Sequence, residues 1–144
     1  MNSMLQKENI EIRQKVRNWQ HAIDAAVGPL IRGGYVEERY KHEIIRNTFT
    51  FGPYYVLAPD IALLHSRPEH GVIHSQLGVL VLREPVKFSK DGYDVRLLVT
   101  LATIDDHSHL DALRKLGKMF CDGDVIKKVV EAETIDEIYE QFST

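Results

Sequence analysis

Two continuous apolar runs constrain the fold of this chain more than any other feature. The first lies within residues 75–84, where leucine and valine fill positions 77 and 79–82 ahead of Pro85, and the second repeats this pattern within residues 93–104. Apolar runs without regular polar alternation are typical of strands that are covered on both faces of a sheet. The sequence therefore predicts two central strands, the first ending at Pro85, with other elements packed on both sides of them.

Segments with helical periodicity lie on either side of these runs in the chain. Apolar residues recur every three or four positions over residues 19–31, before Gly33-Gly34, and again over residues 36–47. Pro29 lies inside the first segment, and we expect it to kink that helix or break it into two pieces, because proline has no N–H for the helical hydrogen bond. Three further helices are predicted beyond residue 105.

Shorter extended segments complete the predicted sheet. Residues 9–14 contain an apolar and polar alternation, as in a strand at a sheet edge, and aromatic and branched residues crowd into residues 54–58. A further extended apolar segment precedes His65. Strands between two early and three late helices predict a single α/β domain over residues 1–144, a layered fold with a central mixed sheet of about five strands flanked by helices on both faces.

The composition is that of a globular protein and argues against several classes of partner. The net charge is -3 and the basic residues are scattered, so the chain has no bulk attraction to nucleic acid or anionic lipid. No segment approaches the roughly 18 apolar residues of a membrane span, and the first residues show no signal-peptide pattern. The single cysteine, Cys121, excludes an internal disulfide. We expect a cytoplasmic protein that neither binds nucleic acid nor inserts into a membrane.

One histidine stands out in the run from Val56 to Glu69. An extended apolar segment brings His65 to a turn that Pro68 closes, and Arg67 follows the histidine two residues later. A neutral imidazole has a ring nitrogen that can attack phosphorus, and an arginine beside it can neutralise the incoming charge. The residues alone leave two interpretations equally open: His65 is a nucleophile, or it only ends a buried strand.

A metal site is the weaker interpretation of the seven histidines. No His-Glu-x-x-His or comparable ligand spacing occurs, and His107 and His109 would diverge on a helix because they are two residues apart. Cys121 lies among apolar residues at a predicted helix end, as a buried cysteine does. We therefore expect neither a bound metal nor another cofactor.

Four ordered blocks of sequence, residues 34–40, 52–69, 80–86 and 108–113, together carry a family resemblance. They resemble the mannitol/fructose-type enzyme IIA family of the bacterial phosphoenolpyruvate-dependent sugar phosphotransferase system (PTS), and its ascorbate-type branch most. The blocks follow one another over nearly the whole chain. This makes the resemblance more specific than a short histidine motif alone.

The resemblance implies a phosphohistidine carrier that needs no bound magnesium. In it, His65 accepts a phosphoryl group from the histidine phosphocarrier protein and donates it to a cysteine of the cognate enzyme IIB, for uptake of a sugar such as ascorbate or a related pentitol or hexitol. His109 matches the family's second histidine, which orients or stabilises the phosphorylated ring, and His107 is its rival. Arg46 matches the arginine that contacts the phosphoryl group, and Arg67 is a second candidate for stabilising the phosphate.

Three residues near His65 depart from the family pattern. The family commonly has glycine, proline and alanine or glycine where this chain has Asp60, Leu64 and Ser66. Loss of the proline removes a restraint on φ before His65, and the Asp60 carboxylate would repel phosphate if it faced the site. The sequence leaves open a regulatory domain that signals its phosphorylation state to a protein partner, a non-phosphorylated binding module, and a homodimer.

Overall fold

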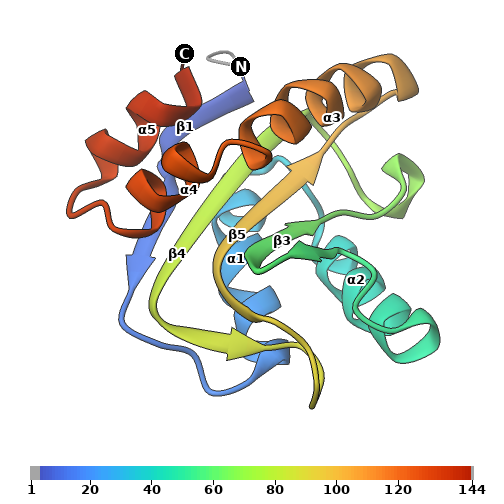
Figure 1. The fold of residues 1–144 in the computed structure, drawn as a ribbon. Coiled ribbons are helices and arrows are strands. Elements are labelled where there is room, and N and C mark those ends of the chain that lie inside the picture. Colours follow the sequence, from blue (N-terminus) through green and yellow to red (C-terminus); the bar gives the residue numbers. More distant parts are fainter. Residues whose placement is uncertain (1–3, 144) are drawn as a thin grey trace.

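A five-stranded mixed sheet forms the centre of the fold in the computed structural model, which describes residues 4–143 (Figure 1). Its strands are β1 (Leu5–Arg13), β2 (Val56–Ala58), β3 (Asp60–Leu64), β4 (Gln76–Lys87) and β5 (Asp94–Ala102). Their order across the sheet is β1-β4-β5-β3-β2, so the predicted edge strand near the start of the chain is confirmed. β1 runs parallel to β4 and β3 parallel to β5, while β4 with β5 and β2 with β3 are antiparallel pairs.

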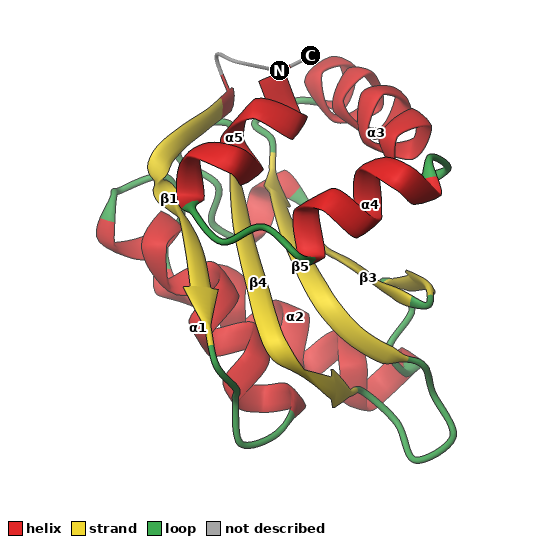
Figure 2. Cartoon of the chain, turned by 60° about the vertical axis from the view of Figure 1, so that its left-hand side comes forward, coloured by secondary structure: helices red, strands yellow, loops and turns green. Residues whose placement is uncertain are grey.

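Helices cover both faces of this sheet, as Figure 2 shows. They are α1 (Trp19–Arg32), α2 (Glu38–Phe51), α3 (Asp106–Phe120), α4 (Gly123–Val130) and α5 (Ile135–Ser143). α1 and α2 pack on one face, and α3, α4 and α5 pack on the other. The predicted layered α/β domain is confirmed. Within residues 4–143, no helix combines the length and the hydrophobicity needed to cross a membrane.

Alternate residues of β4 supply the two halves of the core. Leu77, Val79 and Val81 belong to the apolar cluster under α3, α4 and α5. Leu80 and Leu82 belong to the cluster under α1 and α2. Because successive side chains of a strand point to opposite faces, a strand that is apolar at every position needs cover on both sides. The prediction of doubly covered central strands is confirmed for β4 and for its neighbour β5.

Neither proline interrupts its element. Pro29 was expected to kink α1 or break it, and the break does not occur: α1 is one helix, with Pro29 buried in its last turn. The predicted strand end at Pro85 is wrong. β4 continues through Pro85 to Lys87. Between Val81 and Val86 the ladder with β5 shifts its register, and an irregular position of this kind tolerates a residue without an N–H.

α2 extends one turn beyond its predicted end. The apolar periodicity indicated residues 36–47, whereas the helix spans Glu38–Phe51 and ends at Gly52, whose φ is +79°. Phe49 and Phe51 in the last turn are both exposed, so the burial pattern stops before the helix does. The additional turn carries Phe51 to the edge of the sheet at which His65 lies.

Candidate functional site

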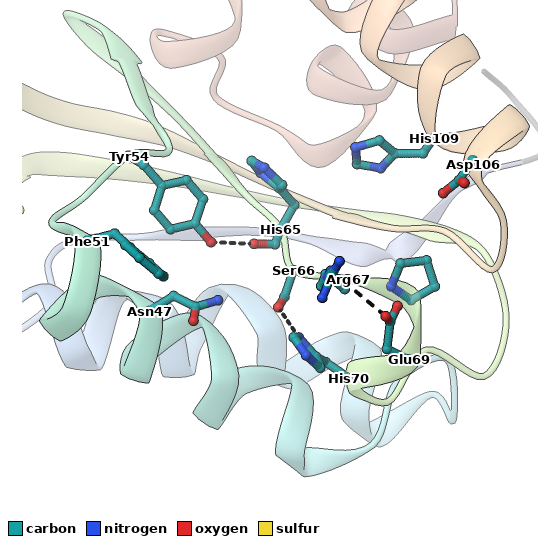
Figure 3. A pocket seen from close by; sticks show the side chains of 11 residues that line it. Asn47, Phe51, Tyr54, His65, Ser66, Arg67, Glu69, His70, Asp106 and His109 are labelled. Carbon is teal, nitrogen blue, oxygen red and sulfur yellow. Dashed lines mark hydrogen bonds and ion pairs between the residues drawn. The ribbon is translucent and has the colours of Figure 1, made fainter.

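The carboxyl ends of β3 and β5 open into a pocket of about 640 Å³. These two strands are adjacent and parallel, with Leu64 paired to Thr100, so the residues after each strand emerge at the same edge of the sheet. His65 follows β3 directly, and His109 lies in the first turn of α3, which follows β5. The pocket is shown in Figure 3 and is lined by Asn47, Phe51, Tyr54, His65, Ser66, Arg67, Pro68, Glu69, His70, Asp106 and His109.

The main chain holds the imidazole of His65 in one tautomer. Its Nδ1 lies 2.7 Å from the carbonyl oxygen of Leu63. A carbonyl oxygen only accepts hydrogen bonds, so Nδ1 carries a proton and, in the neutral ring, Nε2 carries the lone pair. The ring is half-buried and lines the pocket. The protein therefore selects the tautomer of the neutral His65 ring in which Nε2 is the unprotonated nitrogen.

Tyr54 restrains both the main chain and the ring of His65. Its phenol donates a 2.8 Å hydrogen bond to the His65 carbonyl oxygen, and the two rings meet edge to face with centroids 5.5 Å apart. Burial raises the pKa of Tyr54, against a smaller opposing effect of a hydrogen bond with Asn47. The phenol therefore keeps its proton near pH 7 and remains a donor to His65.

A second tyrosine, Tyr40 on α2, supports the turn that follows His65. It is completely buried, and its phenol oxygen accepts a 2.9 Å hydrogen bond from the Ser66 N–H. The same phenol donates a 2.7 Å hydrogen bond to the carbonyl oxygen of Leu101 on β5. Burial raises the pKa of Tyr40 far above its usual value, so the phenol stays neutral. Tyr40 thus ties the turn after β3 to the strand that leads to His109.

His109 projects from α3 toward His65 (Figure 3). The two ring centroids are 5.9 Å apart, and the ring planes are tilted by 51°. Burial lowers the pKa of His109, a positive charge on His65 would lower it further, and Asp106 opposes the shift to a smaller extent, so the neutral form of His109 is favoured near pH 7. His107 is exposed and does not line the pocket. Of the two candidate histidines, the structure brings His109 to the site.

The two candidate arginines are placed differently. Arg67 lines the pocket with its side chain 76% exposed, and its Nε lies 3.8 Å from a carboxylate oxygen of Glu69. Arg46 does not line the pocket; its side chain is 77% exposed, and its Nη1 lies 3.4 Å from the Glu43 carboxylate. Asn47, the next residue of α2, lines the pocket instead. The structure brings Arg67, but not Arg46, into the pocket with the two histidines.

Asp60 lies at the opposite end of β3 from His65 and does not line the pocket. Its carboxylate accepts two 2.9 Å hydrogen bonds from Arg96, so the expectation that it could repel phosphate is not met. Its φ is +72°, in the left-handed region that glycine occupies without strain and that aspartate tolerates. Leu64, at the position of the family's proline, is completely buried in β3, so the core positions the residue before His65.

Several residues of the pocket were missed by sequence reasoning. The Ser66 hydroxyl and His70 Nδ1 lie 2.7 Å apart across the turn, and the four-residue spacing of this pair was readable in the sequence. Tyr54 and Asp106 gave no such signal: Tyr54 donates to the His65 carbonyl oxygen only in the folded chain, and Asp106 lines the pocket from the start of α3. Within residues 4–143, no cluster of three or more histidine, cysteine, aspartate or glutamate side chains is arranged to hold a metal ion.

Comparison with known proteins places this chain in a family. Residues 3–144 match the family described as "Phosphoenolpyruvate-dependent sugar phosphotransferase system, EIIA 2". The ascorbate-specific PTS system EIIA component of Escherichia coli (strain K12) is 30% identical to this chain over 138 residues, which cover 94% of this chain and 90% of that protein. The family match and this relative each span most of the chain that carries the fold and the pocket.

Two solved structures share the fold. The solution structure of the mannitol-specific cryptic phosphotransferase enzyme IIA CmtB from Escherichia coli matches with a TM-score of 0.91 at 28% identity, covering 98% of this chain and 96% of that one. The complex of enzyme IIAMTL and phosphorylated enzyme IIBMTL from Escherichia coli matches in fold with a TM-score of 0.83 at 23% identity, covering 97% of this chain and 99% of that one. With a family match over residues 3–144, this chain belongs to the EIIA 2 family of the phosphoenolpyruvate-dependent sugar phosphotransferase system.

Proposed function

We propose that this protein is a phosphohistidine carrier, a phosphotransferase in which His65 receives a phosphoryl group from the histidine phosphocarrier protein and passes it to a cysteine of the cognate enzyme IIB. The observation that carries this proposal is the 2.7 Å contact between His65 Nδ1 and the Leu63 carbonyl oxygen, which makes Nε2 the nitrogen with the lone pair in the neutral ring, beside an open pocket. Membership of the EIIA 2 family supports the reaction class, since EIIA components are phosphotransfer proteins of sugar transport.

Each transfer exchanges one bond to phosphorus for another. In the first step the Nε2–P bond of His65 forms while the N–P bond of the donor histidine breaks, and its electron pair returns to the donor ring. In the second step a cysteine thiolate forms an S–P bond while the Nε2–P bond breaks. Nδ1–H stays bonded to the Leu63 carbonyl in both steps. Because the first exchange joins two histidine nitrogens, it is nearly balanced and runs without bound magnesium.

Groups around the pocket stabilise the charge of the transferring phosphoryl group. Arg67 is available because its contact with Glu69 is long and exposed. Arg46 reaches the phosphoryl group by leaving its exposed contact with Glu43, from a position on α2 directly before the pocket residue Asn47. His109 orients or stabilises the phosphorylated ring from the facing side of the pocket.

The similar proteins support a sugar class and a phosphoryl acceptor. One relative is ascorbate-specific and one similar structure is mannitol-specific, so the transported sugar is ascorbate or a related pentitol or hexitol. The mannitol protein IIAMTL was solved with its phosphorylated IIB partner, which supports an enzyme IIB as the acceptor here. Residues 1–144 form a single enzyme IIA domain, and we assign it to the cytoplasm, where a carrier of this kind meets both partners.

The test is to incubate the pure protein with phosphoenolpyruvate, enzyme I and the histidine phosphocarrier protein, and to record its intact mass. We expect the wild type to gain about 80 Da, the mass of one phosphoryl group, and His65→Gln to gain nothing. His107→Gln is the matched control, because His107 is exposed outside the pocket, and it should gain as much as the wild type. An unchanged mass of the wild type, or a gain that survives in His65→Gln, would overturn the proposal.

A further inference from the structure

Thr103 lies behind His109, between the end of β5 and the start of α3. It is 2% exposed, and its Oγ1 lies 3.2 Å from Nδ1 of His109. Among residues 4–143, this nitrogen is the only hydrogen-bond partner found for the Thr103 hydroxyl. Thr103 does not line the pocket, so it acts on the site only through His109.

The buried hydroxyl decides which nitrogen of His109 carries the proton. If Nδ1 carried it, Nδ1–H would donate to Thr103 Oγ1, and the hydroxyl proton would be left without an acceptor inside the protein. If Nδ1 carries the lone pair, the hydroxyl donates to it and both groups are satisfied. Buried polar groups are paired in native proteins, so the second arrangement is the stable one.

We infer that Thr103 is a positioning residue that holds His109 in the Nε2–H tautomer, so that His109 offers a hydrogen-bond donor to the phosphoryl group on His65. The role rests on the proposed phosphohistidine function, but the tautomer does not. Nε2 is the ring nitrogen that remains free when Thr103 occupies Nδ1, and the ring projects toward His65 (Figure 3). Burial also lowers the pKa of His109, which keeps the ring in a neutral form in which the choice of tautomer matters.

The two histidines then have opposite tautomers. The Leu63 carbonyl accepts from Nδ1–H of His65 and leaves Nε2 with a lone pair. The Thr103 hydroxyl donates to Nδ1 of His109 and leaves Nε2 with a proton. In their neutral forms, one ring is thereby prepared as the nucleophile and the other as a donor to the phosphoryl oxygens.

The direct test is a long-range ¹H–¹⁵N correlation spectrum of the histidine-labelled wild-type protein at about pH 8, where neutral imidazoles predominate. We expect His109 to show a protonated Nε2 and an unprotonated Nδ1, the reverse of His65. A protonated Nδ1 on His109 would overturn the inference. The spectrum needs no phosphoryl donor, so a protein that cannot be phosphorylated would contradict the proposed function and leave this result standing.

Variants test the consequence for transfer. Thr103→Val keeps the shape of the side chain and removes the hydroxyl, so we expect a mixture of His109 tautomers and roughly tenfold slower transfer from His65 to enzyme IIB. Thr103→Ser keeps the hydroxyl and should restore both the tautomer and the rate. Thr100→Val is the matched control, because Thr100 is also a buried threonine, but it lies on β5 and its hydroxyl donates to the Ala26 carbonyl oxygen on α1. A wild-type tautomer with wild-type transfer in Thr103→Val would overturn the role of Thr103.

Discussion

The phenol of Tyr40 on α2 and the carbonyl oxygen of Leu101 on β5 are joined by a 2.7 Å hydrogen bond across 61 residues of chain. The same buried phenol accepts a hydrogen bond from the Ser66 N–H, directly after His65. One oxygen therefore sets the turn that presents His65 relative to the strand that leads to His109. The separation of the two rings depends on this link as well as on the pairing of β3 with β5.

We expect Tyr40→Phe to lower the free energy of unfolding by about 1–3 kcal/mol and to slow phosphoryl transfer, because Ser66 N–H and the Leu101 carbonyl lose a buried partner. Tyr55→Phe is the matched control. Tyr55 is equally buried, its hydroxyl is bonded to Thr48 at 2.7 Å, and neither residue lines the pocket. Urea unfolding and the rate of phosphorylation should show both variants destabilised and only Tyr40→Phe slowed. Equal rates in the two variants would exclude a role of Tyr40 in placing His65.

The positive φ of Asp60 predicts that its glycine and alanine variants differ in stability. Asp60→Gly and Asp60→Ala both lose the hydrogen bonds from Arg96, but only alanine is strained at φ +72°. We expect the alanine variant to be less stable than the glycine variant by roughly 1 kcal/mol. Urea unfolding measures the difference, and both variants should be phosphorylated at the wild-type rate, because Asp60 lies away from the pocket. An alanine variant as stable as the glycine variant would show that the positive φ is absent in solution.

The lowered pKa of His109 predicts that the stability of the protein depends on pH. Its pKa in the folded protein lies below the ordinary value of 6.5, chiefly because of burial. The unfolded chain therefore binds more protons at acid pH, and the stability that depends on neutral His109 is present above pH 6.5 and declines as the pH falls below it. We expect His109→Gln to lack this decline. Urea unfolding of both proteins at about pH 7.5 and about pH 5.5 measures it, and a stability difference that does not change with pH would contradict the shift.

Substitution of Arg67 or Arg46 should slow phosphoryl transfer without changing stability. We expect Arg67→Ala and Arg46→Ala each to slow phosphoryl transfer by about tenfold, because Arg67 lines the pocket and the proposed function requires Arg46 to reach the phosphoryl group from its contact with Glu43. Neither change should alter stability measurably, since both side chains are exposed and their ion pairs are long. Arg39→Ala removes an exposed α2 arginine that is paired to Glu37, and it should transfer at the wild-type rate. A wild-type rate in Arg46→Ala would remove Arg46 from the site.

The main features of the fold could be predicted because they depend on local patterns. Apolar residues that point to both faces of β4 require a covering layer on each side of the sheet, and the apolar and polar alternation in β1 indicates an edge strand. The break expected at Pro29 and the strand end expected at Pro85 were wrong, because packing in a last helical turn and a register shift in a ladder are tertiary features.

The candidate site could be predicted only in part. The residues around His65 left its role open until the family resemblance was added, and His109 was found through that resemblance; the structure places the two rings 5.9 Å apart. Tyr40 and Thr103 were not found, because their roles depend on single hydrogen bonds that form only after α2, β3 and β5 have packed. Positions one residue apart on an exposed helix turn, such as Arg46 and Asn47, cannot be assigned to a pocket by periodicity alone.

The central claim is that Nε2 of His65 carries the phosphoryl group, and a ¹H–¹⁵N–³¹P correlation spectrum of the phosphorylated protein tests it most directly. The hydrogen bond from Nδ1 to the Leu63 carbonyl predicts that phosphorus couples to Nε2 of His65, with Nδ1 still protonated. Coupling to Nδ1 of His65, or to a nitrogen of any other histidine, would contradict the mechanism.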